Sequence, residues 1–372
     1  MKIVIYSPSN LRAVDQQSQA LLFQKMGHEP LLLTCLPEGV LHKNFQEHGF
    51  KTYSSNITNA GGVSYFLKEI NFLIKFCKKH KVDVVCCHLQ SCAIIAGFAK
   101  FFIKAKVVYM RHHTDFVGIY NSPKERLQNW MANTLSPKII AISDTVNKIL
   151  INENVPERKI HRINLCYDFG EYRNDFTNQI DIIKQELHSP LTLLYVARLD
   201  PVKRHTYAFK IVEDLLAQGV ECKLFCIGKG SLENELNKYI EDKKLGEHIV
   251  MKGFVTNVFD YISVADIVLL LSDTEASSHM LKEAGICGKT LIACADVGDF
   301  NDYIVHGGNG YLVNKENPIP ETVEILKKIS SNKHIVSVLG ENLKKTVYKH
   351  FSIDSNFEAL YSTLFKAIKI QL

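Results

Sequence analysis

The stretch that decides the fold is LLLSDTEASSHMLKEAGICGKTLIA, residues 269–293. It opens with an apolar run typical of a buried strand and continues through a polar turn. A helical segment follows, which ends near Gly285 or Gly288 before a second β-rich run. A strand, a crossover helix and a strand form the repeating unit of a parallel sheet. The stretch therefore predicts an α/β domain in which the polar turn follows the carboxyl end of a strand.

The same alternation of apolar, β-rich runs and amphipathic segments extends along the whole chain. The candidate strands are residues 2–6, 29–34, 82–87, 106–110, 138–142, 191–196, 222–227, 249–251, 267–271, 290–293 and 310–313. Helical patterns fill the gaps between them, for example at residues 16–26, 63–80, 123–135, 145–152, 205–218, 231–243 and 320–331. Strands that are apolar throughout and alternate with helices indicate parallel sheets covered on both faces.

The strands form two series, separated by a polar segment near residues 170–190. We therefore expect an α/β fold of two Rossmann-like, doubly wound domains that face a cleft. The first domain should cover residues 1–180 and the second residues 181–350. Residues 351–372 should add a C-terminal helix that could pack back on the first domain.

The composition agrees with a two-domain globular protein. The 372 residues are 46% hydrophobic and 22% charged, and the net charge of +5 is too small to indicate nucleic-acid binding. The ten cysteines include no CxxC pair and no spacing typical of a metal site, so we expect reduced core cysteines. No apolar run approaches the ~20 residues that a membrane span needs. The beginning, MKIVIYSPSN, reads as a first strand rather than a signal peptide, so we expect a cytoplasmic protein.

Two carboxylates of the quoted stretch are candidate functional groups. Glu275 and Glu283 are eight positions apart, which on one helix would separate them by about 12 Å along the axis. We expect Glu275 in the turn and Glu283 about one turn inside the helix. Ser277 and Ser278 are then candidate N-caps, because their hydroxyls can accept hydrogen bonds from the first-turn amides. Carboxylates in these places can accept hydrogen bonds from the hydroxyl groups of a sugar.

The beginning of this helix is also a candidate phosphate site. Backbone amides in the first turn of a helix have no acceptor within the helix, and the helix dipole adds positive potential there. The amides involved would belong to residues Ser278, His279, Met280 and Leu281. Such a helix start binds phosphate groups in many nucleotide-binding proteins.

The order of strand, turn, Glu, seven residues, Glu, Ala, Gly and strand resembles the retaining glycosyltransferases of family 4, also called group 1, which have the GT-B fold. The resemblance runs from end to end and is clearest over residues 191–313. It implies transfer of a sugar from a nucleotide-sugar such as a UDP-sugar to a hydroxyl group of a saccharide or lipid-linked acceptor, with retention. It also implies a role in the synthesis of cell-surface polysaccharide or another glycoconjugate. No DxD motif follows a strand, so no metal ion and no other cofactor is expected.

Further matches occur in the order that the family has. VARLDPVKRH, residues 196–205, resembles the segment whose basic pair binds the donor diphosphate, which here would be Arg198 and Lys203. Fixed cations at this place would stabilise the charge that develops on the departing nucleoside diphosphate. The strand–Gly–x–Gly turn that begins at Gly228 resembles a loop near the nucleotide.

Two matches concern the nucleotide base and the end of the donor domain. Gly253, Phe254 and Val255 resemble the family's loop that meets the base. Residues 296–313, DVGDFNDYIVHGGNGYLV, resemble the tail of the donor domain.

The first domain, which would bind the acceptor, matches less closely. In RHHTDF, residues 111–116, His112 is the better match to a histidine that the family places near the reacting sugar, and His113 is the alternative. Ser9 and Asn10 stand where the family has a glycine pair that approaches donor phosphate or acceptor. The Phe- and Lys-rich region 66–106 could contact a membrane surface, or it could be a core face backed by a solvated lysine face.

Three other functions fit the same residues. A sugar-nucleotide epimerase or hydrolase would use the donor without an acceptor. An inverting transferase would need a base in the first domain, and Asp115 could serve. A non-catalytic sugar-nucleotide-binding subunit would keep the donor site without turnover.

Overall fold

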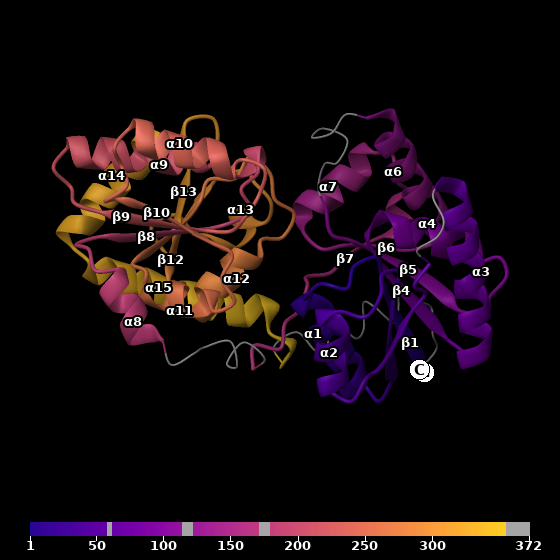
Figure 1. Ribbon diagram of the computed structural model, residues 1–372. Coiled ribbons are helices and arrows are strands. Elements are labelled where there is room, and N and C mark those ends of the chain that lie inside the picture. The colour runs from indigo at the N-terminus through magenta and orange to yellow at the C-terminus, as the bar shows by residue number, and fades with distance from the viewer. Residues whose placement is uncertain (58–61, 114–121, 171–178, 355–372) are drawn as a thin grey trace. The chain divides into compact units, whose positions relative to one another are not determined.

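The computed structural model describes residues 1–57, 62–113, 122–170 and 179–354 (Figure 1). The chain forms two compact units. The first comprises Met1–Asp168 and the residues from Phe351 onward, and the second comprises Phe169–His350. Each unit has its own parallel sheet with helices on both faces, so the predicted pair of Rossmann-like doubly wound domains is confirmed (Figure 1).

The first unit is built on a seven-stranded sheet in the order β3-β2-β1-β4-β5-β6-β7, with every neighbouring pair parallel. Its strands are β1 Lys2–Ser7, β2 Glu29–Thr34, β3 Lys51–Ser54, β4 Val84–His88, β5 Lys106–Arg111, β6 Ile139–Ala141 and β7 Ile160–Arg162. All five residues of β4 are buried, as expected for a central strand covered on both faces. The order reverses between β1 and β4, which places a topological switch point at their carboxyl ends.

The helices of the first unit cover both faces of this sheet. They are α1 Val14–Lys25, α2 Val40–Glu47, α3 Gly62–His80, α4 Leu89–Ala99, α6 Pro123–Leu135 and α7 Asp144–Asn152. The helices α3, α4 and α6 pack side by side on one face, and α1 packs with α2 on the other (Figure 1).

The second unit is built on a six-stranded parallel sheet in the order β10-β9-β8-β11-β12-β13. Its strands are β8 Thr192–Val196, β9 Lys223–Ile227, β10 Ile249–Gly253, β11 Ile267–Leu270, β12 Thr290–Cys294 and β13 Tyr311–Val313. Here the order reverses between β8 and β11. The loops after these two strands therefore meet at the second switch point.

The helices of the second unit are α8 Ile180–Glu186, α9 His205–Ala217, α10 Glu233–Asp242, α11 Val258–Val264, α12 His279–Ile286, α13 Phe300–Tyr303, α14 Pro318–Ser331 and α15 His334–Phe351. Figure 1 shows α9, α10 and α14 on one face of the sheet and α8, α11, α12 and α15 on the other. The second unit therefore has the same Rossmann-like arrangement as the first, a parallel sheet with helices on both faces.

The chain returns to the first unit at the end of α15. The Tyr167 N–H donates to the Phe351 carbonyl at 2.7 Å, and the Ile353 N–H donates to the Tyr167 carbonyl at 3.1 Å. Lys25 of α1 forms an ion pair with Asp354 at 2.9 Å. The helix that the sequence predicts after Asp354 lies outside the described residues.

Candidate functional site

The connection from β11 to α12 has the local structure that the sequence predicts. Glu275 lies in the turn, and α12 begins at His279 with Ser278 as its N-cap. The Ser278 hydroxyl accepts the Leu281 N–H at 3.4 Å. Glu283 is the fifth residue of the helix and is half-buried. The two glutamates therefore lie on either side of the beginning of α12.

Lys203 lies against Glu275 in the second unit. Its Nζ is 2.5 Å from Glu275 Oε1, and the two side chains are 16% and 14% exposed. The Tyr195 hydroxyl fixes this arrangement, because it donates to the Lys203 carbonyl and accepts the Leu271 N–H at 3.0 Å. A lysine and a glutamate from different loops are thus held together at the switch point between β8 and β11.

The other predicted cation has a different environment. The Arg198 side chain is 72% exposed and forms an ion pair with Asp200 at 2.5 Å. Within the described part of the chain, no ion pair joins Arg198 to Glu275. The structure therefore gives Lys203 a fixed partner in the turn and leaves Arg198 at the surface of its loop.

The predicted glycines hold neighbouring loops close together. Gly228 has a φ of +145°, its N–H donates to the Gly253 carbonyl at 2.8 Å, and a Cβ there would collide with the Ala197 carbonyl. The loops after β8, β9 and β10 therefore run side by side at one edge of the sheet. Next to them, Phe254 is 70% exposed and Val255 is half-buried. An exposed aromatic ring at this edge is available to a ligand.

Two of the four amides predicted for phosphate are already bonded within the protein. The Leu281 N–H donates to the Ser278 hydroxyl, and the Ser278 N–H donates to Asp299 Oδ1 at 3.0 Å. The expectation of free amides therefore does not hold at these two positions. The first-turn amide of Met280 remains a candidate for an anion.

A buried ion pair that the sequence did not reveal lies behind the same turn. Lys282 Nζ is 2.6 Å from Asp299 Oδ2, and the side chains are 0% and 1% exposed. The one signal in the sequence was a lysine between Leu281 and Ala284, two residues that are buried in α12. Asp299 lies in the loop after β12, and only the folded chain brings it to the helix.

In the first unit, His112 follows β5 and contacts a second histidine. His112 Nε2 is 2.8 Å from Nδ1 of His88, which ends β4, and His88 Nε2 is 3.0 Å from Gln19 Oε1. His112 Nδ1 is 3.6 Å from Asp15 Oδ2. Burial, followed by the nearby His112, lowers the pKa of His88 to about 3. His88 is therefore neutral at physiological pH and can orient His112 by a hydrogen bond.

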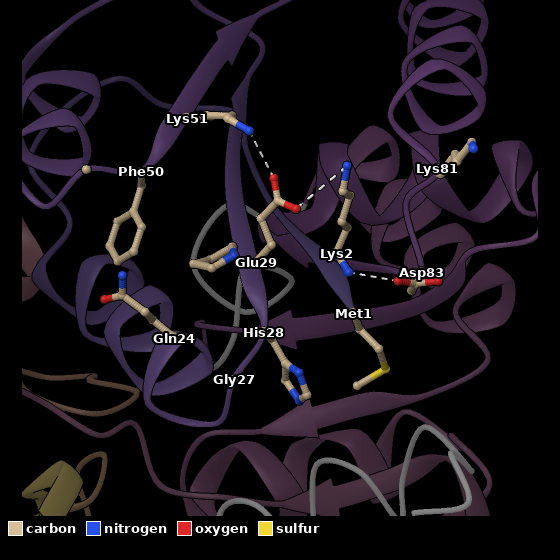
Figure 2. Close-up of a pocket in the computed structure, with 12 residues that line it drawn as sticks. Met1, Lys2, Gln24, Gly27, His28, Glu29, Phe50, Lys51, Lys81 and Asp83 are labelled. Carbon is tan, nitrogen blue, oxygen red and sulfur yellow. Dashed lines mark hydrogen bonds and ion pairs between the residues drawn. The ribbon is translucent and has the colours of Figure 1, made fainter.

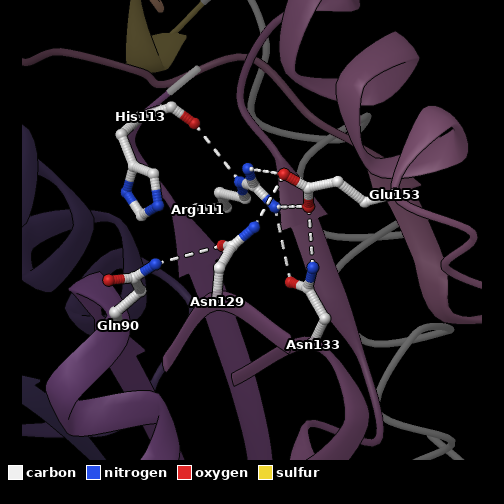
Figure 3. A network of polar contacts seen from close by, with 6 residues as sticks. All are labelled: Gln90, Arg111, His113, Asn129, Asn133 and Glu153. Atoms are coloured by element: carbon white, nitrogen blue, oxygen red, sulfur yellow. Dashed lines mark hydrogen bonds and ion pairs between the residues drawn. The ribbon is translucent and has the colours of Figure 1, made fainter. Parts of the chain in front are cut away.

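His113 lies over a second polar network, drawn in Figure 3. Arg111 ends β5 and is fully buried, and its guanidinium forms a bidentate ion pair with Glu153. Its Nε also donates to the His113 carbonyl at 3.3 Å (Figure 3). Asn129 and Asn133 each donate to Glu153 at 2.7 Å. The network therefore holds the backbone just beyond His112.

The two histidines differ in access to solvent. The His112 side chain is 16% exposed, whereas the ring nitrogens of His113 are buried. Burial, and then the Arg111 charge, holds the pKa of His113 well below its usual range. The loop that follows, including Asp115, lies outside the described residues.

Ser9 and Asn10 shape the loop after β1. The Ser9 hydroxyl accepts the Leu11 N–H at 3.2 Å. The Asn10 amide donates to the Pro37 carbonyl at 2.9 Å, and the Asn10 carbonyl accepts the Leu41 N–H at 3.0 Å. Asn10 therefore ties the first loop to the segment before α2, a role that the sequence did not indicate.

One group of three side chains among the described residues could hold a metal ion by distance alone, namely Asp15, His88 and His112. The two imidazole nitrogens that face each other are at hydrogen-bond distance, so a single shared proton satisfies both. The remaining ring nitrogen of His88 is at hydrogen-bond distance from Gln19 Oε1. Hydrogen bonding therefore accounts for the contact between the two histidines.

A hollow of about 650 Å³ lies at the amino-terminal edge of the first sheet, which is the edge opposite His88 and His112 (Figure 2). Lys2 and Lys51 form ion pairs there with Glu29, at 3.6 and 3.1 Å. The Lys2 N–H donates to Asp83 at 2.7 Å. Ligands of open α/β sheets bind at the carboxyl ends of the strands, so the histidine edge is the better candidate site.

Comparison with known proteins identifies the class. Residues 177–346 match the model for glycosyl transferases group 1, and residues 18–170 match the model for Glycosyltransferase Family 4. The chain therefore belongs to the group 1 glycosyltransferases of family 4, enzymes with the GT-B fold. Among the described residues, no helix has both the length and the apolar character needed to cross a membrane.

Three relatives illustrate the similarity. The N-acetyl-alpha-D-glucosaminyl L-malate synthase of Bacillus anthracis is 25% identical over 313 residues, which are 80% of this chain and 79% of that protein. The poly(ribitol-phosphate) alpha-N-acetylglucosaminyltransferase of Staphylococcus aureus is 22% identical, over 84% of this chain and 64% of that one. The crystal structure of HepE from Anabaena in complex with UDP-glucose superposes with a TM-score of 0.79 and 18% identity, over 98% and 100% of the two chains.

Proposed function

We propose that this chain transfers a sugar from a UDP-sugar to a hydroxyl group of a saccharide or lipid-linked acceptor, with retention of anomeric configuration. The product would be a cell-surface polysaccharide or another glycoconjugate. The observation that carries the proposal is the ion pair between Lys203 and Glu275, directly before the beginning of α12. The complex of HepE with UDP-glucose supports a uridine nucleotide, because the two chains share a fold over almost their whole lengths.

The second unit would bind the donor. When the bond between the anomeric carbon and the phosphate breaks, negative charge grows on the departing UDP, and cations next to it lower the barrier. Lys203 and the N-terminal end of α12 supply fixed positive potential, and Arg198 can reach toward the ligand from its exposed loop. Glu275 and Glu283 would accept hydrogen bonds from hydroxyl groups of the donor. This set would operate without a metal ion or another cofactor.

The first unit would bind the acceptor. In a front-face substitution the acceptor oxygen bonds to the anomeric carbon, and its proton passes to the departing phosphate, so no enzyme nucleophile is needed. The proposed part of His112 is to form a hydrogen bond near the reacting sugar through Nδ1, because its Nε2 already faces His88. Its contact with neutral His88 supports this, because the pair fixes the direction of the imidazole.

We also propose that the enzyme works in the cytoplasm, at the inner face of the membrane. Phe101 and Phe102, which follow α4, are 70% and 62% exposed, and Lys104 and Lys106 next to them are exposed as well. Exposed aromatic rings among lysines are typical of interfacial binding to anionic lipid. Sedimentation with phosphatidylglycerol vesicles tests this contact. Phe101→Ser with Phe102→Ser should abolish binding, and equal binding by wild type and variant would contradict it.

A donor screen by thermal shift tests the central proposal. UDP-N-acetylglucosamine should come first, because the names of two relatives contain this sugar, followed by UDP-glucose and GDP-mannose. A ligand at a hundred times its Kd adds about 2.7 kcal/mol of stability, which raises Tm by several degrees in a unit of this size. A rise with a uridine nucleotide is expected, and no rise with any of them would contradict a donor site.

Turnover then separates the candidate functions. Wild type should transfer the sugar to an acceptor with retention, which NMR of the product measures. Glu275→Ala should reduce the rate of transfer by at least ~100-fold, because this loss is typical of removing one preorganised electrostatic group. Glu283→Ala should weaken donor binding. Isomer or free sugar formed without an acceptor would favour the epimerase or hydrolase instead, and binding without turnover a non-catalytic subunit.

A further inference from the structure

The buried pair of Lys282 and Asp299 belongs to a compact network behind the donor turn. Asp299 Oδ2 accepts hydrogen bonds from Lys282 Nζ at 2.6 Å and from the Ser277 hydroxyl at 2.7 Å. Lys282 Nζ also donates to the Ser277 oxygen at 2.7 Å. Asp299 Oδ1 accepts the Ser278 N–H at 3.0 Å. One carboxylate thus connects the loop after β12 with the last residues before α12.

Stability alone does not account for this pair. Both side chains are almost fully buried, at 0% and 1% exposure. Two charges lose much of their hydration when they are buried, and apolar residues of similar volume often stabilise a protein as well or better. A buried ion pair is better explained when its hydrogen bonds fix a particular arrangement of the backbone.

The arrangement that this pair fixes surrounds Glu275. Residue 298, next to Asp299, is a glycine with a φ of +57°, and a Cβ there would lie 2.6 Å from the Glu275 Cβ. Glu275 is therefore enclosed by the loop of Gly298 on one side and contacts Lys203 on another. Asp299 joins this loop to Ser278, the N-cap of α12. A shift of Asp299 would move both Glu275 and the first turn of the helix.

Charge gives Lys282 a second effect at the same place. Without Lys282, Asp299 would leave a negative charge 3.0 Å from the Ser278 amide nitrogen, at the helix end where the diphosphate is proposed to bind. A buried negative charge at this helix end would repel an anionic ligand, because the low dielectric of the interior screens it little. Lys282 neutralises the carboxylate, so the helix end keeps its attraction for an anion.

We propose that Lys282 and Asp299 are positioning residues of the donor site, which hold Glu275 and the first turn of α12 in the arrangement that receives the nucleotide diphosphate. The proposal rests on the donor site proposed above. It assigns the pair no contact with the substrate.

Two charge-neutral double variants test the proposal. Lys282→Met with Asp299→Asn keeps an acceptor for the Ser278 N–H, whereas Lys282→Met with Asp299→Ala removes it. The double variant Lys327→Met with Glu324→Gln removes an exposed ion pair of the same unit and serves as the control. The measurements are the UDP affinity by calorimetry well below each variant's own Tm, and hydrogen exchange of residues 273–281 without nucleotide.

The expected order distinguishes positioning from stability. The Ala double variant should bind UDP about tenfold more weakly than the Asn double variant and exchange faster over residues 273–281, because one buried hydrogen bond has been removed. Single Lys282→Met should lose on the order of 10 °C in Tm and bind UDP more weakly than the Asn double variant, because it leaves a bare carboxylate. The control should match wild type.

Equal UDP affinity and equal exchange in the two double variants would overturn the proposal, since the pair would then serve stability alone. Wild-type protein that binds no nucleotide would instead contradict the proposed function. The exchange of residues 273–281, which needs no nucleotide, would still report whether the pair holds the turn. The two failures are therefore distinguishable.

Discussion

Each unit holds an ion pair, buried in the second unit and partly buried in the first, behind the loop that carries its candidate functional groups. The two pairs act on those loops differently. In the first unit, Arg111 and Glu153 are surrounded by two asparagine amides, and the network contacts the loop through the His113 carbonyl. In the second unit, Asp299 bonds directly to the N-cap residue of α12. Arg111 and Glu153 thus contact their loop only where it begins, at His113. Asp299 is itself part of the loop after β12 and bonds to the turn before α12.

The functional groups in front of the pairs also differ. The first unit presents imidazoles, and His88 is neutral because burial and the nearby His112 lower its pKa to about 3. The second unit presents charges, with Lys203 against Glu275. An acceptor hydroxyl needs a directed hydrogen bond, whereas a diphosphate needs compensation of charge. The electrostatics of the two edges agree with the proposed acceptor and donor sides.

The largest effect is expected from breaking the first pair. Arg111→Met leaves the half-buried Glu153 without its cation, and we expect a loss of about 3–5 kcal/mol in the free energy of unfolding. Trp130 is the chain's one tryptophan and lies in α6 of the first unit, so its fluorescence in a urea titration reports on this unit. Arg111→Met with Glu153→Gln should recover most of the loss. A loss below ~1 kcal/mol in the single variant would show that the pair is not what holds the loop.

The next largest effect concerns the charges of the donor edge. Lys203→Met should lower kcat/KM by ~100-fold, because a preorganised cation near the developing charge is lost. Arg198→Met should lower kcat/KM by less, because the Arg198 side chain is 72% exposed. The entropy lost when this side chain is ordered on binding offsets part of its attraction to the diphosphate. Lys210→Met on α9, whose partners are Glu213 and Asp214, is the control. A larger loss for Arg198→Met would reverse this ranking of the two cations.

The sequence was sufficient for most of the fold because its buried strands are long apolar runs. Every strand that it predicted is present, and the Ser278 N-cap is confirmed. The missed strands β3 and β7 have four and three residues and lie at the edges of the sheet, too short to show a pattern. Not named among the predicted helices are α2, α4, α8, α11, α13 and α15. For α4 the reason is that LQSCAIIAGFA is apolar on nearly all sides and shows no helical periodicity.

The sequence was less informative about the partners of the site residues. Local chemistry predicted Glu275 in a turn, and the family resemblance assigned Lys203 to the donor diphosphate. Neither predicted that the two side chains meet, because Lys203 and Glu275 are 72 positions apart. The contacts of Tyr195 with Leu271 and of His88 with His112 likewise depend on which strands are neighbours. Spacing along the chain does not encode such contacts. The sequence alone could not separate Lys203, which is fixed, from Arg198, which is exposed.

A smaller effect should separate the two edges by kinetics. His112→Ala removes one directed hydrogen bond on the acceptor side, and we expect kcat to fall about tenfold with the Kd for UDP unchanged. His88→Ala should act in the same direction and less strongly, because it only orients His112. His80→Ala at the end of α3 is the control. Weaker UDP binding in the His112 variant would contradict a division between donor and acceptor edges.

The last prediction concerns acid stability and a histidine of the donor edge. Burial, and then the charge of Lys203, lowers the pKa of His205 to about 4, so the folded state favours its neutral form. Between pH 6.5 and 4 the unfolded chain binds a proton that the folded chain does not, and stability falls with falling pH by at most about 1.4 kcal/mol per pH unit. His205→Phe, which can keep the ring contact with Tyr195, should flatten this part of the curve. Thermal unfolding of wild type and His205→Phe at pH 4.5, 5.5 and 7 measures this dependence of stability on pH. Parallel curves for the two proteins would mean that His205 titrates normally.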